Sequence, residues 1–153
     1  KREILITTPY YIPDTSLQES LIIAALSGIK VKLLVPQKGD SVFVHIACES
    51  FFEELLKAGV EIYLYEKGFV HAKTFVIDGE VASVGTANLD ARSFDLNFEV
   101  NAIVYNEEVA NDLRRIFYND LKDARLLQLE QWQKRSEFKQ MIERVVRLFS
   151  PFL

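Results

Sequence analysis

Apolar positions along the chain switch between two spacings, one typical of strands and one typical of helices. Three short, β-branched apolar runs predict buried strands: Ile4–Thr8, Lys30–Val35 and Val60–Tyr65. The segments between them, Asp14–Ser27 and Asp40–Ala58, carry apolar residues at helical intervals, and Gly28 and Gly59 follow as helix stops. Strands that alternate with helices in this way predict parallel βαβ units.

The next stretch predicts antiparallel strands in the same sheet. Val70–Ile77 and Val81–Gly85 flank an Asp78-Gly79 pair, which a tight hairpin turn prefers. Phe98–Tyr105 predicts the last strand, and a helix is expected from Glu107 to about residue 123.

These elements predict one α/β domain over residues 1–124, with a mixed sheet flanked by helices on both faces. Residues 125–153 predict a helical extension in which basic and apolar residues mix. Its segment Ser136–Leu148 places four apolar residues on one stripe: Phe138, Met141, Ile142 and Val145. Two interpretations of this stripe stay open, an interfacial segment at a membrane or packing against the domain or a missing part of the protein.

Charge separates the extension from the rest. The formal net charge is −4, but residues 125–153 carry six Lys or Arg against three Glu, so the extension is +3 and residues 1–124 are −7. An acidic body disfavours nucleic-acid binding, whereas a basic, apolar tail suits an anionic membrane surface. The single Cys48 excludes an internal disulfide and a multi-cysteine metal site.

Candidate chemistry concentrates at His71 and Lys73. If both residues lie on the predicted strand, their side chains project from the same side, roughly 6–7 Å apart. An imidazole beside a fixed ammonium is suited to attack on a phosphodiester. The ammonium neutralises the non-bridging oxygens, while the imidazole acts as nucleophile or proton donor.

The segment from His71 to Asp78 resembles the HxKxxxxD signature of the phospholipase D superfamily. Gly85–Asn88 is similar to the GSxN element of that superfamily, with Thr86 at the usual Ser position, and the acidic residue that often follows is matched by Glu99. The sequence around these motifs, notably Thr8–Pro13 and Gly85–Asn101, most resembles the C-terminal catalytic half of the bacterial cardiolipin synthases. A phospholipase D-like fold is therefore expected.

The resemblance implies a role for each matched residue. His71 and Lys73 would be catalytic, Asn88 and Thr86 would bind the phosphate, and Glu99 would orient His71 by a hydrogen bond, with a plain salt bridge as the alternative. Asp78 matches the aspartate of the HxKxxxxD signature and is therefore also a catalytic candidate. An Asp before Gly is also what a hairpin turn requires, so we interpret Asp78 as more structural than catalytic.

Two aromatic residues and a second histidine are further candidates. Tyr10 and Tyr11 follow the first strand, where ligands of open α/β sheets gather, so they would line a substrate pocket or, alternatively, belong to the core. His45 lies among apolar residues of a predicted helix and is interpreted as a helix-surface or cleft-edge residue, not a catalytic one.

A single HxK unit supplies only half of the reaction's machinery, because one imidazole cannot be both the nucleophile and the donor to the leaving oxygen. The resemblance implies that an N-terminal unit of the same chain, or a homodimer partner, supplies the second histidine. It also implies phosphatidyl transfer between two phosphatidylglycerol molecules through a phosphohistidine, without a metal or other cofactor.

The parent protein would act at the bacterial cell membrane, and this piece of it would be soluble. Two alternatives remain. A phospholipase D, phosphodiesterase or nuclease would use water as acceptor, and a non-catalytic half would serve dimerisation or lipid docking.

Overall fold

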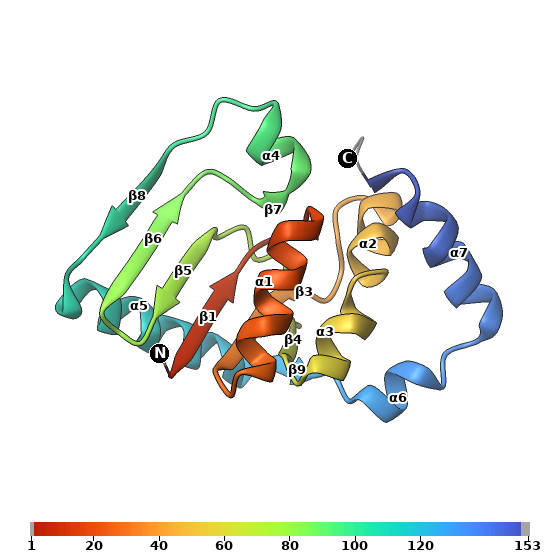
Figure 1. Ribbon diagram of the computed structural model, residues 1–153, viewed down its shortest axis with the longest axis horizontal. Helices are drawn as coiled ribbons and strands as arrows, with labels where there is room; N and C mark the ends of the chain where they lie inside the picture. The colour runs from red at the N-terminus through yellow and green to blue at the C-terminus, as the bar shows by residue number, and fades with distance from the viewer. Residues whose placement is uncertain (1, 151–153) are drawn as a thin grey trace.

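A seven-stranded mixed sheet forms the centre of the computed structural model, which describes residues 2–150 (Figure 1). The strand order is β8-β6-β5-β1-β3-β4-β9. The strands β1, β3 and β4 are parallel, and each of the other four runs antiparallel to its neighbour. In chain order the seven strands are β1 (Glu3–Thr7), β3 (Lys30–Pro36), β4 (Glu61–Tyr65), β5 (Thr74–Ile77), β6 (Val81–Gly85), β8 (Asn101–Val104) and β9 (Ala124–Leu126). The predicted mixed sheet is confirmed.

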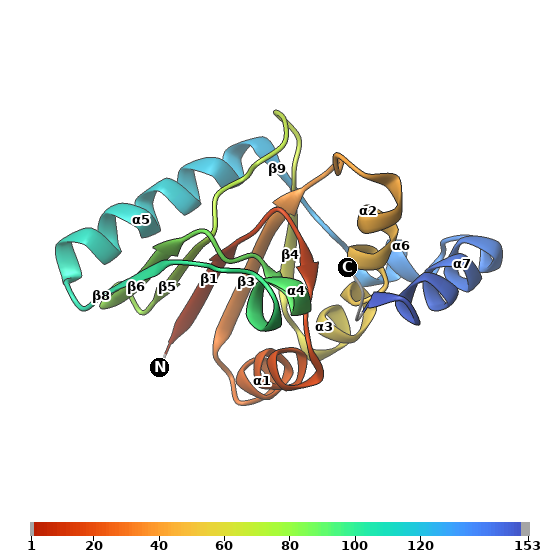
Figure 2. The same ribbon diagram turned by 90° about the horizontal axis from the view of Figure 1, so that it is seen from above.

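Helices pack on both faces of this sheet, as predicted (Figure 2). One face meets α5 (Glu107–Asp120), and the other meets α1 (Thr15–Leu26), α2 (Val42–Glu49) and α3 (Phe52–Ala58). Successive side chains of β1 point to opposite faces of the sheet, so the core has two parts. Leu5 packs with the residues on the α5 side, and Ile6 packs with those on the α1–α3 side. The remaining elements are β2 (Tyr11–Ile12), β7 (Leu89–Asp90), α4 (Ala91–Asp95), the 3-10 turn η1 (Leu121–Asp123), α6 (Leu129–Gln133) and α7 (Glu137–Arg147).

The prediction of one helix over Asp40–Ala58 is wrong, because the chain breaks between α2 and α3 at Ser50. The Ser50 hydroxyl donates to the carbonyl of Ala47 at 2.6 Å, a local hydrogen bond that competes with helix continuation. The break lets both Phe51 and Phe52 reach the core, where each packs against the ring of Tyr11.

Two predicted strands are shorter than expected. His71 and Lys73 do not lie on a strand, because β5 starts at Thr74, where pairing with β1 begins. The last strand is β8, which starts at Asn101 instead of residue 98. Its start passes close to Gly85, where a Cβ would lie 2.4 Å from the carbonyl oxygen of Val100, so only glycine fits.

The C-terminal extension also differs from expectation. Arg125 lies in β9, which pairs with β4, so helix begins only at α6. In α6 the indole of Trp132 is buried, 5.7 Å from the ring of Phe52. The apolar stripe of α7 stays largely outside: Phe138, Met141 and Val145 are exposed and Ile142 is partly buried, whereas the buried apolar residue of the helix is Val146, which is not part of the stripe. Within residues 2–150, none of the helices is long and apolar enough to cross a membrane.

The predicted hairpin turn joins β5 to β6 and also holds the start of β1. Asp78 and Gly79 both have positive φ, 55° and 70°, as a type I′ turn requires. The Asp78 carboxylate accepts hydrogen bonds from the backbone N–H groups of Arg2 at 2.6 Å and Glu3 at 2.8 Å. Asp78 therefore links the turn to the first strand of the sheet.

Replacing Asp78 with Ala should lower the free energy of unfolding by about 1–3 kcal/mol, because two backbone donors lose their acceptor. Urea denaturation measures the loss. The matched control is Asp112→Ala on the exposed surface of α5, expected to change the free energy by less than about 0.5 kcal/mol. Equal effects of the two substitutions would contradict a structural role for Asp78.

Candidate active site

His71 and Lys73 sit at the carboxyl edge of the parallel strands. Because β5 runs antiparallel to β1 and pairs Thr74 with Thr7, the residues just before β5 lie beside the end of β1. This edge is where open α/β sheets place their ligands. The reversed direction of β5 therefore brings the candidate chemistry to that edge.

The side chains of His71 and Lys73 touch, although neither residue is in a strand. Lys73 Nζ donates to the backbone carbonyl of His71 at 2.8 Å and lies 3.1 Å from His71 Nε2. An ammonium can only donate, so this second contact places a lone pair on Nε2. That is the form in which an imidazole acts as a nucleophile or base.

The charge on Lys73 is set by competing effects. Partial burial lowers the pKa of Lys73 below its ordinary value, while the negative charges of Glu99 and Asp90 act in the opposite direction. The pKa of Glu99 is lowered by hydrogen bonds from Thr86, Asn97 and Ser93 and by the charge of Lys73. Glu99 thus remains ionised and supports the ammonium.

The expected hydrogen bond from His71 to Glu99 is absent among the described residues. Asn97 Nδ2 instead donates to Glu99 Oε1 at 3.2 Å. The alternative, a salt bridge, is also not formed within residues 2–150, since Glu99 acts on Lys73 only as a nearby charge.

Two aromatic rings extend from the imidazole, that of Tyr10, which the sequence offered as a pocket candidate, and that of Phe69, which it did not. The ring of Phe69 lies 5.6 Å from the ring of His71 and 5.9 Å from that of Tyr10. The Tyr10 hydroxyl donates to Asp40 at 2.6 Å, and burial together with this carboxylate raises the pKa of Tyr10 to about 12. Phe69 and Asp40 are therefore parts of the site surroundings, and the position of Phe69 two residues before His71 was the available signal.

The other aromatic candidate, Tyr11, has no surface for a substrate. Its side chain is completely buried, and its hydroxyl donates to Gln18 Oε1 at 2.6 Å. Burial raises the pKa of the Tyr11 hydroxyl. His45 lies on α2 with its Nε2 3.5 Å from Glu49, and it does not contact His71.

The Gly85–Asn88 segment starts at the last residue of β6 and lies at the same edge, where the N–H of Gly85 donates to the carbonyl of Lys73 at 3.2 Å. The Thr86 hydroxyl accepts a hydrogen bond from the backbone N–H of Val100 at 2.9 Å, which anchors the segment that carries Glu99. Asn88 donates its backbone N–H to Ser93 Oγ at 3.2 Å, while its side-chain carbonyl is buried without a partner in the described chain. An unused polar group of this kind is atypical of a folded interior and marks Asn88 as a candidate ligand-binding residue.

Asp78 is separated from these groups by the length of β5. His71 and Lys73 precede the first residue of that strand, and Asp78 follows its last. The structure thus brings together His71 and Lys73, with Glu99 near enough to act on Lys73 by its charge, and leaves Asp78 at the opposite end.

An apolar cavity of about 410 Å³ opens beside Lys73. It lies against the face of β5, β6 and β8 that α5 does not cover, with Phe75, Ile103 and Tyr105 in its wall. No group of three His, Cys, Asp or Glu suited to hold a metal occurs in residues 2–150.

Solved structures define the class of this fold. A phospholipase D family member, Nuc from Salmonella typhimurium, superposes with a TM-score of 0.72 at 17% identity, covering 84% of this chain and 83% of that chain. Phosphatidylserine synthase from Haemophilus influenzae superposes with a TM-score of 0.76 at 15% identity, covering 99% of this chain and 40% of that one. The chain has the phospholipase D-like fold.

Sequence comparison narrows the class further. The family model described as "Cardiolipin synthase, PLD-like domain" matches residues 1–121, and the chain belongs to this family. It is 51% identical to the major cardiolipin synthase of Bacillus subtilis and 48% identical to a cardiolipin synthase of Clostridium perfringens, each over all 153 residues. The chain spans only 32% of the length of each of these relatives.

The NMR titration of the Lys73 side chain should have its midpoint below 10.5, the ordinary lysine value, because burial disfavours the ammonium. Glu99→Gln removes a charge that stabilises the ammonium, so it should move the midpoint to still lower pH. Glu53→Gln, on α3 beside Lys57, is the matched control and should leave the Lys73 titration unchanged. A midpoint insensitive to Glu99→Gln would show that this carboxylate does not act on Lys73.

Proposed function

We propose that this chain is the C-terminal catalytic half of a cardiolipin synthase, which transfers a phosphatidyl group from one phosphatidylglycerol molecule to another and releases glycerol. The observation that carries the proposal is the contact of Lys73 Nζ with His71 Nε2 at 3.1 Å, in a chain of this family. Phosphatidylglycerol is an anionic lipid, and the ammonium of Lys73 suits the charge of its phosphate.

The transfer requires two imidazoles on opposite sides of phosphorus. One imidazole attacks phosphorus as the bond to the glycerol oxygen breaks, and the other donates a proton to that oxygen. The second imidazole then takes a proton from the hydroxyl of the acceptor phosphatidylglycerol, whose oxygen attacks phosphorus and breaks the phosphorus–nitrogen bond. Lys73 and its counterpart would neutralise the non-bridging oxygens throughout, so the chemistry needs no metal or cofactor.

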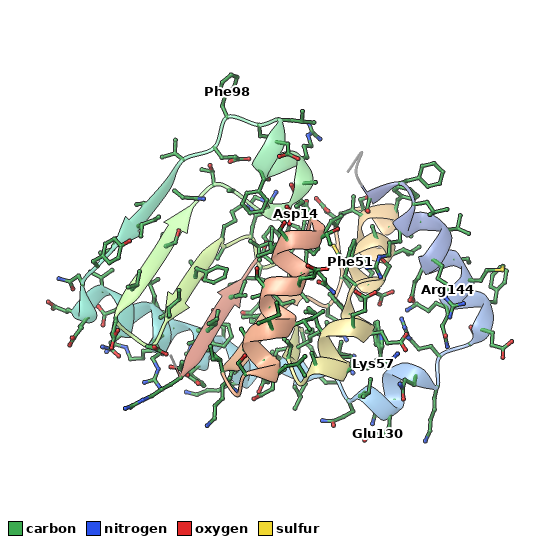
Figure 3. The ribbon with its side chains drawn as sticks, viewed as in Figure 1. Asp14, Phe51, Lys57, Phe98, Glu130 and Arg144 are labelled. Atoms are coloured by element: carbon green, nitrogen blue, oxygen red, sulfur yellow. The ribbon has the colours of Figure 1, made fainter. Side chains whose placement is uncertain are left out.

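Residues 2–150 supply one such imidazole at this edge, so a second unit completes the site in the proposal. Exposed apolar side chains between α4 and β8 and along β8 support a protein partner here: Phe94, Leu96, Phe98, Val100, Ile103 and Tyr105. Figure 3 shows Phe98 at the outermost point of the segment between α4 and β8. The partner is an N-terminal HKD unit of the same polypeptide or a second copy of this chain.

The remaining roles follow from the same placement. Asn88 would bind the phosphate by donating from its side-chain NH₂ group, since its unpartnered carbonyl can only accept, and Thr86 would hold Glu99 in position. Asp78 would support the fold and would not contact the substrate. The parent protein would work at the bacterial cell membrane, where its lipid substrates are. The −7 charge of residues 1–124 disfavours the nuclease alternative.

In the full-length protein, His71→Ala should reduce cardiolipin formation from phosphatidylglycerol by at least about 10²–10⁴-fold, the usual contribution of a proton-transfer or nucleophilic group. His45→Ala replaces the other histidine of residues 1–153 and should retain activity. Thin-layer chromatography of the lipid products makes the measurement. If the unmodified protein forms phosphatidic acid and no cardiolipin, the protein is a hydrolase and not a transferase. If His71→Ala keeps full activity, this half of the protein is not catalytic.

Residues 1–153 alone should be inactive as a monomer, because one imidazole cannot fill both positions on the reaction axis. If two copies pair, the rate should rise with the square of the concentration at low concentration. Turnover assays combined with sedimentation velocity test this. Activity from a species proven to be monomeric would refute the requirement for a second unit.

A further inference from the structure

The segment that carries His71 has little backbone structure of its own. Residues 66–73 connect β4 to β5 without helix or strand, and Figure 2 shows this connection projecting beyond the sheet. Within the described residues 2–150, residues 67–72 make no hydrogen bond between backbone groups. The position of the His71 imidazole therefore depends on side-chain contacts.

The contacts of the imidazole itself are few. Lys73 Nζ lies 3.1 Å from Nε2, which fixes one atom of the ring. The ring of Phe69 lies 5.6 Å from the imidazole, at an interplanar angle of 33°. A carboxylate hydrogen bond, the usual device that orients a reacting imidazole, is not formed with Glu99. The ring of Phe69 is thus the contact that restricts the plane of the imidazole.

Phe69 is in turn held by Tyr10 and Asp40. The ring of Tyr10 lies 5.9 Å from that of Phe69, and the Tyr10 hydroxyl donates to Asp40 Oδ2 at 2.6 Å. The pKa of Tyr10, raised to about 12 by burial and by Asp40, keeps the donated proton on the hydroxyl at neutral pH. At the backbone of Tyr10, the carbonyl accepts the hydroxyl of Thr8 at 2.8 Å. Phe69, which is exposed, is therefore connected through Tyr10 to a charged group.

These three residues come from three different connections at one edge of the sheet. Tyr10 follows β1, Asp40 follows β3 and Phe69 follows β4, each within four residues of the end of its strand. Because β1, β3 and β4 are parallel, their carboxyl ends lie at the same edge. The contacts among Asp40, Tyr10 and Phe69 thus tie the connection that carries His71 to the fixed ends of the other parallel strands.

We propose that Asp40, Tyr10 and Phe69 form an aromatic support, which holds the imidazole of His71 in the orientation that reaction at phosphorus requires. All three are positioning residues, because they act through His71 and do not touch the substrate. The inference rests on the proposed function, since the orientation matters for catalysis only if His71 reacts. A small displacement of a reacting group lowers the rate steeply, so loss of the aromatic support should lower kcat and leave KM unchanged.

Steady-state kinetics of the full-length protein with phosphatidylglycerol tests the role of Phe69. Phe69→Leu keeps an apolar side chain without the ring, and it should lower kcat by about tenfold, the upper end of what an aromatic pair contributes. Phe69→Tyr retains the ring and should restore most of the loss. The matched control is Phe43→Leu on α2, since Phe43 is 43% exposed and Phe69 38%. It should leave kcat and KM unchanged.

Tyr10→Phe is the sharper variant, because it removes only the hydroxyl that bonds to Asp40. The matched control is Tyr63→Phe on β4, where the lost hydroxyl likewise donates to a carboxylate, Glu61 Oε2, at 2.6 Å. The measurement is the NMR spectrum of the full-length protein with isotope-labelled histidine, in which the signals missing from His71→Ala belong to His71. The ring of Phe69 shifts these signals by its ring current. Tyr10→Phe should move them toward their positions in Phe69→Leu, and Tyr63→Phe should leave them in place.

Three results would overturn the proposal. If the His71 signals do not change in Tyr10→Phe, the imidazole does not depend on the aromatic support. If Phe69→Leu raises KM and leaves kcat unchanged, Phe69 contacts the substrate and does not act through His71. If Tyr63→Phe moves the His71 signals as far as Tyr10→Phe does, the change reports a general effect of a lost hydroxyl on the fold.

The NMR measurement does not depend on turnover, so it separates this proposal from the proposed function. If the unmodified protein makes no cardiolipin and Tyr10→Phe moves the His71 signals, the proposed function fails and the aromatic support stands. If cardiolipin forms, and neither the His71 signals in Tyr10→Phe nor kcat in Phe69→Leu changes, the aromatic support fails and the proposed function stands.

Discussion

The pairing of β5 against β1 in the antiparallel direction is the constraint on which the site depends. The parallel strands β1, β3 and β4 all end at one edge of the sheet, and β5 must start there because its direction is reversed. That start carries His71 and Lys73. The Thr8 side chain links the segments at this edge, since its hydroxyl accepts the N–H of Leu89 at 3.3 Å and donates to the carbonyl of Tyr10 at 2.8 Å. If β5 were parallel to β1, His71 and Lys73 would lie at the amino ends of the parallel strands instead of their carboxyl ends.

The alternation of helices and strands was predictable because it depends on local spacing. The hairpin was predictable for the same reason, since Asp78 and Gly79 alone supply the two positive φ angles of the turn. The break at Ser50 and the late start of β5 were not predictable, because each is decided by residues far away in the sequence. The rings of Phe51 and Phe52 pack against Tyr11, and Thr74 is the first residue of β5 that pairs with β1. The strand β9 is a further case, since its three residues are a strand only in contact with β4.

The site shows the same division between local and distant effects. The nearness of His71 and Lys73 was predicted, but on the wrong basis, since neither residue lies on a strand and Lys73 Nζ contacts His71 Nε2 at 3.1 Å from the segment before β5. The partners of Glu99 and the burial of Tyr11 depend on how separate segments fold together, and the sequence did not reveal them. The imidazole of His71 packs against the ring of Phe69 and contacts the ammonium of Lys73. The charge of Glu99 acts on Lys73 from farther away, and the contact to His71 Nε2 comes from Lys73 Nζ, not from a carboxylate.

The position of Asp78 bears on what a match to the HxKxxxxD pattern means. In the proposed function the histidine and the lysine of the pattern would carry the reaction, whereas the aspartate holds the hairpin on the first strand. A relative that had lost catalysis would be free to lose the first two letters and still need the third to fold. In such a protein the surviving aspartate would identify the ancestry of the fold and carry no information about activity.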